Sequence, residues 1–280
     1  MNDDFSYDPV TAIDERSARG ETAELFADIR ATMAIPLVTS IWRGLAGMDD
    51  ALAQVWRLTK PVYLSGMPQR ALARCIAQTP LPAPPPLSTA QLASVGLSDT
   101  DVDAARTIIA AYNRSNGMNL MALSALVTPP AEHDDADTVA FERLRQPSWP
   151  PFPELLAQTE IAATTWSMVR EVNAFGAASS DANVATLWRH LAHWPALLAL
   201  IHASFATHQR DGSIRVATNS MVALARAGGA RMAHLRPAQL HISPAAHTTI
   251  SGYVSTTTQV VRMVTMGHAL AAWLASGRTS

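Results

Sequence analysis

The sequence contains the aromatic–arginine pairs Trp42-Arg43 and Trp188-Arg189. The planar guanidinium group of arginine binds a carboxylate through two parallel hydrogen bonds, so one of these arginines could hold the acid group of a small substrate. The pairs also have a structural interpretation, in which the tryptophan packs in a core and the arginine bonds a carboxylate or a helix C-terminus. The sequence leaves both interpretations open.

A second candidate is Asn116, which stands beside Gly117 inside an apolar helical pattern. Asparagine and glycine both lower helix propensity here without an evident gain, and such local conflicts are common at functional sites. We therefore interpret Asn116 as a pocket residue, with a helix cap or kink as the alternative.

The titratable residues give weaker evidence for a functional site. His190 and His193 are three residues apart, a spacing that does not by itself define a zinc site, and we interpret them as surface or hydrogen-bonded histidines. Asp181 precedes the Trp188 helix, where an acidic residue usually caps the helix; a displaced catalytic base is the alternative. The acidic run 132–137 lacks the spacing of a metal site and is expected to be a solvated loop.

Composition narrows the class of protein. The chain has 280 residues, of which 48% are hydrophobic and 16% charged, and its net charge is -2. These values favour a folded protein and argue against nucleic acid as a partner. The acidic start and the absence of a long apolar run predict a cytoplasmic protein without membrane association. The single cysteine, Cys75, excludes an intrachain disulfide, and the alanine-rich composition is typical of bacterial coding.

Apolar residues recur at three- and four-residue spacing in most long segments, which predicts an all-α fold. Proline 61 is expected to end the third helix, and the proline-rich stretch 79–88 is expected to run as an extended strap. An interruption is expected near Asn116 in the last helix before the middle of the chain. The predicted helices of this part are 22–34, 37–45, 50–59, 68–78 and 102–127.

The chain also contains an internal repeat. An offset of 146 residues places 38–53 over 184–199 without a gap, with seven identities that include Trp42/Trp188 and Arg43/Arg189. This match predicts a tandem duplication of a helical unit packed as a pseudo-dimer. Its expected parts are a first repeat over 20–127, a proline-rich and acidic linker over 128–153, and a second repeat over 154–276.

Three motifs occur in a specific order: Ile35-Pro36 followed by Trp42-Arg43-x-Leu45-Ala46, then Tyr112-Asn113-x-x-Asn116, then Trp188-Arg189-x-Leu191-Ala192-x-Trp194-Pro195. In this order they resemble the group I 2-haloacid dehalogenases (the DehI family) over most of the chain. The resemblance implies an all-helical pseudo-dimer that needs no metal or organic cofactor. It also implies hydrolysis of both enantiomers of short 2-halocarboxylic acids by direct attack of an activated water.

The resemblance can be carried over residue by residue. The asparagine that holds the water falls on Asn116, and its neighbour one helical turn later is Asn119. We expect Ser40, Asn116 and Thr186 to line one enclosed pocket between the halves. The remaining pocket wall falls on Leu37, Ala185 and Leu187.

The base position of the family falls on Leu187, which cannot accept a proton. A threonine and a glutamate that are also implicated in the family fall near Ser65 and Gln69. Asp181 is the substitute base that we consider. The sequence therefore predicts a 2-haloacid dehalogenase-like hydrolase acting on a small 2-substituted carboxylic acid. The alternative is a non-catalytic descendant that binds a small acid, and both hypotheses leave a homodimer open.

Overall fold

The computed structural model describes residues 13, 15–131, 147–177, 184–237, 242–254 and 259–277. Within these ranges every regular element is helical, in twelve α-helices and two short 3-10 helices, which confirms the predicted all-α fold. None of the described helices is long and apolar enough to cross a lipid bilayer.

The first helices are α1 (Gly20–Met33), α2 (Ser40–Ala46), α3 (Ala51–Leu64), α4 (Met67–Gln78) and α5 (Thr89–Ser94). The predicted end of the third helix at Pro61 was wrong, because α3 continues to Leu64. Proline removes one ladder hydrogen bond, but the next two side chains, Val62 and Tyr63, are buried in the core and hold the last turn. The strap 79–88 contains no helix, as predicted. Helix α5 was not predicted, although Ser88 and Gln91 form a capping box at its start.

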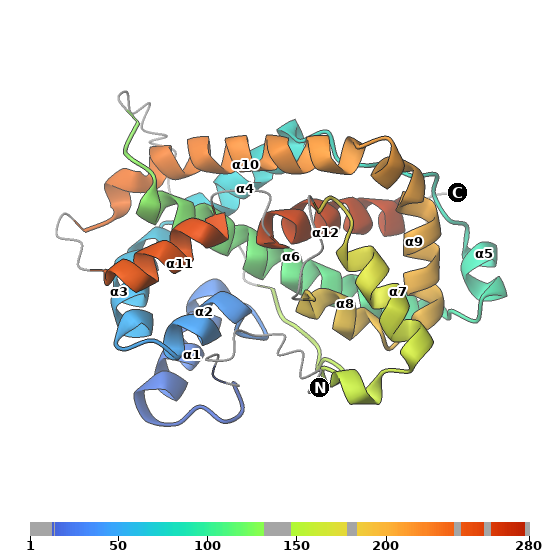
Figure 1. The fold of residues 1–280 in the computed structure, drawn as a ribbon, viewed down its shortest axis with the longest axis horizontal. Coiled ribbons are helices and arrows are strands. Elements are labelled where there is room, and N and C mark those ends of the chain that lie inside the picture. The colour runs from blue at the N-terminus through green and yellow to red at the C-terminus, as the bar shows by residue number, and fades with distance from the viewer. Residues whose placement is uncertain are drawn as a thin grey trace, which may run out of the picture.

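Helix α6 (Asp99–Val127) passes through the middle of the molecule without a break (Figure 1). The interruption expected near Asn116 and Gly117 is therefore absent, and the two residues lie inside a continuous helix. Glycine allows a close approach there, because a Cβ atom at Gly117 would overlap the end of the Leu72 side chain on α4. The weak helix former thus marks a close helix–helix approach rather than a kink.

The later helices are α7 (Ala163–Asn173), α8 (Thr186–Leu191), α9 (Pro195–Arg210), α10 (Ser213–Met232), α11 (Pro244–Val254) and α12 (Gln259–Ser276). Helix α10 contains a second close approach. A Cβ atom on Gly229 would lie 2.7 Å from the backbone carbonyl carbon of Ser124, so only glycine allows α10 to pack this closely on α6.

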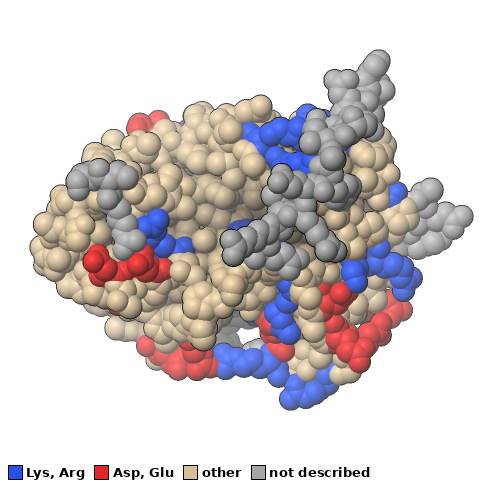
Figure 2. Space-filling model, turned by 180° about the vertical axis from the view of Figure 1, so that it is seen from behind, with Lys and Arg blue, Asp and Glu red and all other residues tan. Residues whose placement is uncertain are grey.

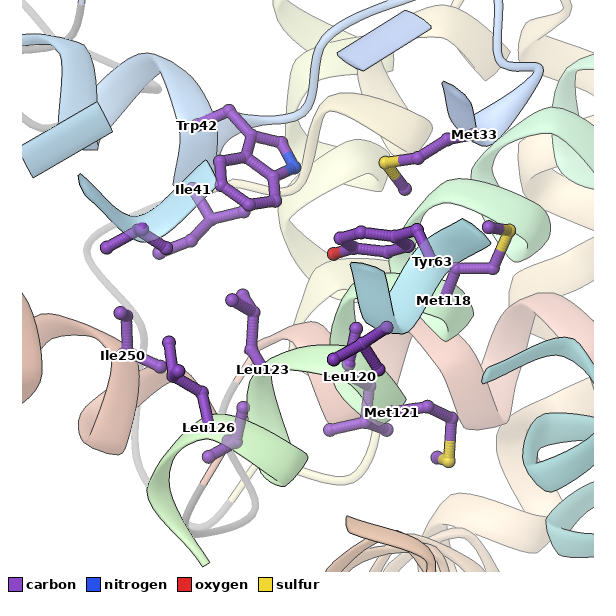
Figure 3. Close-up of a cluster of buried hydrophobic side chains, with 14 of the residues drawn as sticks. Met33, Ile41, Trp42, Tyr63, Met118, Leu120, Met121, Leu123, Leu126 and Ile250 are labelled. Atoms are coloured by element: carbon purple, nitrogen blue, oxygen red, sulfur yellow. The ribbon is translucent and has the colours of Figure 1, made fainter. Parts of the chain in front are cut away.

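Two hydrophobic cores hold the fold together. The first contains Trp42 and the later part of α6 and extends to α10, α11 and the start of α12. Figure 3 shows part of it, with Trp42 and Tyr63 on one side and Leu120 and Leu123 of α6 on the other. The second core contains Trp188, the earlier part of α6, helices α7 to α9 and the later part of α12. Helices α6 and α12 each contribute side chains to both cores and therefore connect the two cores.

Trp42 on α2 and Trp188 on α8 are both fully buried, one in each core. Their indole groups differ in hydrogen bonding: Nε1 of Trp42 donates to Oδ1 of Asn119 over 3.1 Å, whereas Nε1 of Trp188 has no partner among the described residues. The tandem duplication stays a prediction. Of its expected linker, residues 132–146 lie outside the described part of the chain.

Candidate functional site

A cavity of about 790 Å³ lies where the starts of α2 and α8 meet α6. This volume is in the usual range for small-molecule sites. Ser40 is the first residue of α2 and Thr186 the first residue of α8, and both line the cavity. The segment 36–39 and residues 154, 155 and 157 form further parts of the wall.

Arg43 and Arg189 line the same cavity, one helical turn after Ser40 and Thr186. Nε of Arg189 donates to the carbonyl of Leu156 over 2.8 Å, which fixes the direction of this guanidinium group. Burial lowers the pKa of Arg43, and the charge of Arg189 lowers it further. Both groups stay cationic, because guanidinium does not lose its proton in proteins. The cavity wall therefore holds two positive charges close enough to repel one another.

Tyr112 of α6 faces these arginines across the cavity wall. Its hydroxyl group lies 2.8 Å from Nδ1 of His190 and also hydrogen-bonds to Thr186. Burial raises the pKa of Tyr112 to about 12, although Thr186 and the two arginines act in the opposite direction. The phenol is therefore protonated at neutral pH.

His190 of α8, which is the partner of Tyr112 in this hydrogen bond, is also buried. Burial lowers its pKa to about 4, and the nearby charges of His193 and Arg189 lower it further, so the imidazole is neutral at pH 7. A backbone hydrogen bond joins the ring to Pro153, whose only backbone hydrogen-bonding group is its carbonyl. We accordingly assign the ring proton to Nε2, which leaves Nδ1 to accept from the Tyr112 hydroxyl.

Three glutamates line the cavity, and each has a partner in the protein. Glu15 forms an ion pair with Arg30 and accepts from the backbone of Val38, and Glu154 pairs with Arg16. The third, Glu160, accepts from the backbone N–H of Ala157. Acidic and basic side chains also intermix along the lower edge of the rear face in Figure 2. Since four arginines and three glutamates line the cavity, its wall has an excess positive charge that favours an anionic ligand.

Of the residues predicted from the sequence, Leu37, Ser40 and Thr186 line this cavity together. Asn116 is half-buried and does not line it, although it lies one turn along α6 from Tyr112. Asp181 lies outside the described residues.

The other predicted residues are buried in the protein interior. Asn119 accepts at Oδ1 from Trp42 and Tyr63, and its Nδ2 donates to Thr39 over 2.7 Å, so its amide is used within the first core. The backbone N–H of Ala185 donates to Asn173. Leu187 is 1% exposed and packs in the second core. The structure therefore does not bring these side chains into the cavity, because neighbouring residues on a short helix point in different directions.

The two positions considered for a further acid pair also lie elsewhere. Ser65 is buried and donates to the carbonyl of Val62 over 2.6 Å, and Gln69 lines a different cavity. The described residues contain no group of three or more His, Cys, Asp or Glu that could hold a metal ion.

Sequence reasoning missed Tyr112 and His190 as a pair. Two signals could have found it. Tyr112 lies four residues before Asn116 and hence on the same face of its helix, and His190 directly follows the repeated arginine Arg189.

The chain shares its fold with solved structures of D-2-haloacid dehalogenase. A mutant of that enzyme in complex with D-2-CPA is 15% identical with a TM-score of 0.70, and the match covers 95% of each chain. Another mutant structure is 14% identical with a TM-score of 0.71, covering 96% of this chain and 95% of that chain. The enzyme with L-LA is 14% identical with a TM-score of 0.67 and 94% of each chain covered. No protein-family model and no curated protein sequence matches. At these identities the likeness defines a D-2-haloacid dehalogenase-like fold.

Proposed function

We propose that this chain binds a small 2-substituted carboxylate between α2, α6 and α8 and acts on it as a 2-haloacid dehalogenase-like hydrolase. The observation that carries the proposal is the meeting of Arg43 and Arg189 with the hydrogen-bonded Tyr112–His190 pair in one cavity. The fold shared with D-2-haloacid dehalogenase supports the same class of reaction.

The arginines supply the binding step. A carboxylate placed between Arg43 and Arg189 neutralises the repulsion between the two guanidinium groups and gains charge-assisted hydrogen bonds. The Ser40 hydroxyl group, at the first turn of α2, is a further donor beside it, whereas the Thr186 hydroxyl group already donates to Tyr112.

The reacting water needs a proton acceptor. Hydrolysis of a 2-haloacid breaks the carbon–halogen bond, whose electron pair leaves with the halide, and forms a bond from carbon to the water oxygen. The water must then lose one proton. We assign this proton to the Tyr112–His190 pair: Tyr112 takes it while passing its own proton to Nδ1 of His190. The imidazolium later releases the proton to solvent, so the products are a 2-hydroxy acid, a halide ion and a proton.

The low pKa of His190 has two opposite consequences for this step. The imidazole is always in its neutral, proton-accepting form at pH 7. At pH 7, however, which is about three units above this pKa, protonation of the imidazole costs about 4 kcal/mol. A base of this kind gives slower catalysis than one matched to neutral pH.

The residue at position 187 favours a second candidate function. Leu187 is buried in the second core, at the place where the family resemblance expects a catalytic aspartate. Without that carboxylate, the cavity could bind a small carboxylate and not hydrolyse it.

Two measurements on the wild-type protein distinguish these functions. Halide release from D- and L-2-chloropropionate tests hydrolysis, and calorimetric titration with propionate tests binding. The neutral amide 2-chloropropionamide is the matched control, because it lacks the charge that the arginines would bind. Halide release from the acid alone is the expected result. Binding of propionate without halide release would favour the second function, and equal binding of acid and amide would refute both.

A further inference from the structure

A second cavity, of about 410 Å³, lies between α4, α6 and α12. None of the described residues lines both cavities. Tyr112 borders the first and its neighbour Asn113 borders the second, so the two cavities lie on different sides of α6. The mechanism proposed above uses no group from this second cavity.

Three polar side chains that line the second cavity have a buried atom without a hydrogen-bond partner among the described residues. These atoms are Oε1 of Gln69, Oδ1 of Asn113 and Nε2 of His268, one from each of the three helices. A buried polar atom without a partner is destabilising, and native proteins contain few of them. Oδ1 of Asn113 packs against Gly267 of α12, which leaves Oε1 of Gln69 and Nε2 of His268 as the two atoms to which a ligand could supply the missing hydrogen bonds.

The wall between these polar atoms is apolar. Leu72 and Ile76 of α4, Met118 of α6 and Ala271 of α12 contribute hydrocarbon or thioether surface. An apolar surface of this kind favours a ligand with a hydrocarbon body, because transfer of that body from water is favourable.

The charge of the cavity disfavours a cationic ligand. Among the described residues that line it, no side chain is a carboxylate, and Arg114 is the only cation. Nε of Arg114 already donates to the carbonyl groups of Met33 and Ala34, over 2.8 and 3.2 Å. Burial lowers the pKa of His268 to about 4, so its imidazole is neutral at pH 7. Oε1 of Gln69 accepts a hydrogen bond, and a ligand that donates one is therefore complementary.

We propose that the cavity between α4, α6 and α12 is a second binding site, for an uncharged molecule with an apolar body and a hydrogen-bond donor such as an alcohol. Oε1 of Gln69 accepts the donated hydrogen bond, Nε2 of His268 carries the ring proton and donates to the oxygen of the ligand, and Leu72, Ile76 and Met118 cover its apolar body.

Benzyl alcohol and toluene form a matched pair of probes, because they differ by the hydroxyl group alone. In a titration followed by backbone amide NMR, benzyl alcohol is expected to shift the signals of Ala73, Ala110 and Ala271 saturably. Toluene is expected to bind about tenfold more weakly, which corresponds to one hydrogen bond. Equal dissociation constants, or no saturable shift at these residues, would overturn the proposal.

The variant Gln69→Leu tests the polar part of the site. Replacement of an unpartnered buried amide by a hydrocarbon group is close to neutral for folding, so the variant should keep its thermal stability. Its preference for benzyl alcohol over toluene should fall to about threefold or less. Gln78→Leu, at the exposed end of the same helix, is the control and should keep the tenfold preference. An unchanged preference in Gln69→Leu would show that this amide does not bind the alcohol.

Discussion

The hydroxyl oxygen of Tyr112 lies 2.8 Å from Nδ1 of His190, although 78 residues separate them in the sequence. The contact joins α6 to α8 at the wall of the larger cavity. It also belongs to a continuous series of hydrogen bonds that runs from Thr186 through Tyr112 and His190 to the carbonyl of Pro153. Such a series gives a proton a path from the cavity to a buried imidazole.

The first prediction concerns this path. Tyr112→Phe removes the hydroxyl group but keeps the ring, so it should lower halide release about a hundredfold or more, the usual contribution of a positioned acid or base. Propionate binding should change by less than about threefold, because the arginines remain. The measurement is initial halide release at pH 7 together with the calorimetric dissociation constant.

A matched control is Tyr63→Phe, which removes a buried tyrosine hydroxyl outside the cavity. That hydroxyl donates to Asn119 over 2.9 Å, so the variant should lose about 1 kcal/mol of unfolding free energy and keep its halide release. If both tyrosine variants lose activity equally, the effect of Tyr112→Phe is structural and the proton path is incorrect.

The second prediction concerns carboxylate binding. Arg43→Gln removes one of the two cations in the cavity and should weaken propionate binding about ten- to a hundredfold, the value expected for a lost hydrogen bond to a charged group. Arg57→Gln, on the exposed face of α3, changes the net charge equally and should leave binding unaltered. Similar weakening in both variants at low ionic strength would indicate a general charge effect in place of a specific site.

Much of the architecture was predictable because helices follow local rules. Periodic apolar residues in 20–33 and 67–78 specify helices by themselves, and the elements formed close to the predicted positions. The errors at Pro61 and Asn116 have one cause. In both places, burial in tertiary contacts outweighs a weak local preference, and sequence periodicity does not report which neighbour a helix will meet.

The site was harder to predict for a related reason. Ser40 and Thr186 were found because the repeat places them at matching positions, whereas Leu187 was included by its adjacency in sequence. On a helix the next residue turns by about 100°, so Thr186 lines the cavity while Leu187 packs in the core. The shifted pKa values of Tyr112 and His190 arise from burial, which a sequence does not state.

The third prediction concerns position 187. Leu187→Asp would install the aspartate of the family resemblance, but the leucine side chain is 1% exposed and surrounded by the second core. The variant should lose at least about 3 kcal/mol of unfolding free energy, since it removes packing and buries a carboxyl group. Urea unfolding at pH 7 measures this loss. A stable variant with halide release above the wild-type rate would mean that position 187 reaches the cavity after all.

The last prediction is a loss of stability in mild acid. Burial lowers the pKa of both His190 and His268 from 6.5 to about 4 in the folded protein. Below pH 6.5 the unfolded chain therefore binds protons that the folded chain does not, so the unfolding free energy should fall as the pH drops from about 6.5 to 4. Each histidine contributes about 3 kcal/mol over this window. Carboxylates with lowered pKa values, such as Asp28, act mainly below about pH 4, so the histidines dominate this window.

Urea unfolding at pH 7.0 and 4.5, at constant ionic strength, measures this dependence. His268→Gln should remove about half of the stability difference between the two pH values, because glutamine binds no proton in either state. The control His234→Gln changes an exposed histidine and should keep the wild-type difference. His268 lies outside the larger cavity, so halide release by His268→Gln should stay at the wild-type level at pH 7. A wild-type protein equally stable at both pH values would refute the prediction, because two buried neutral histidines require a loss.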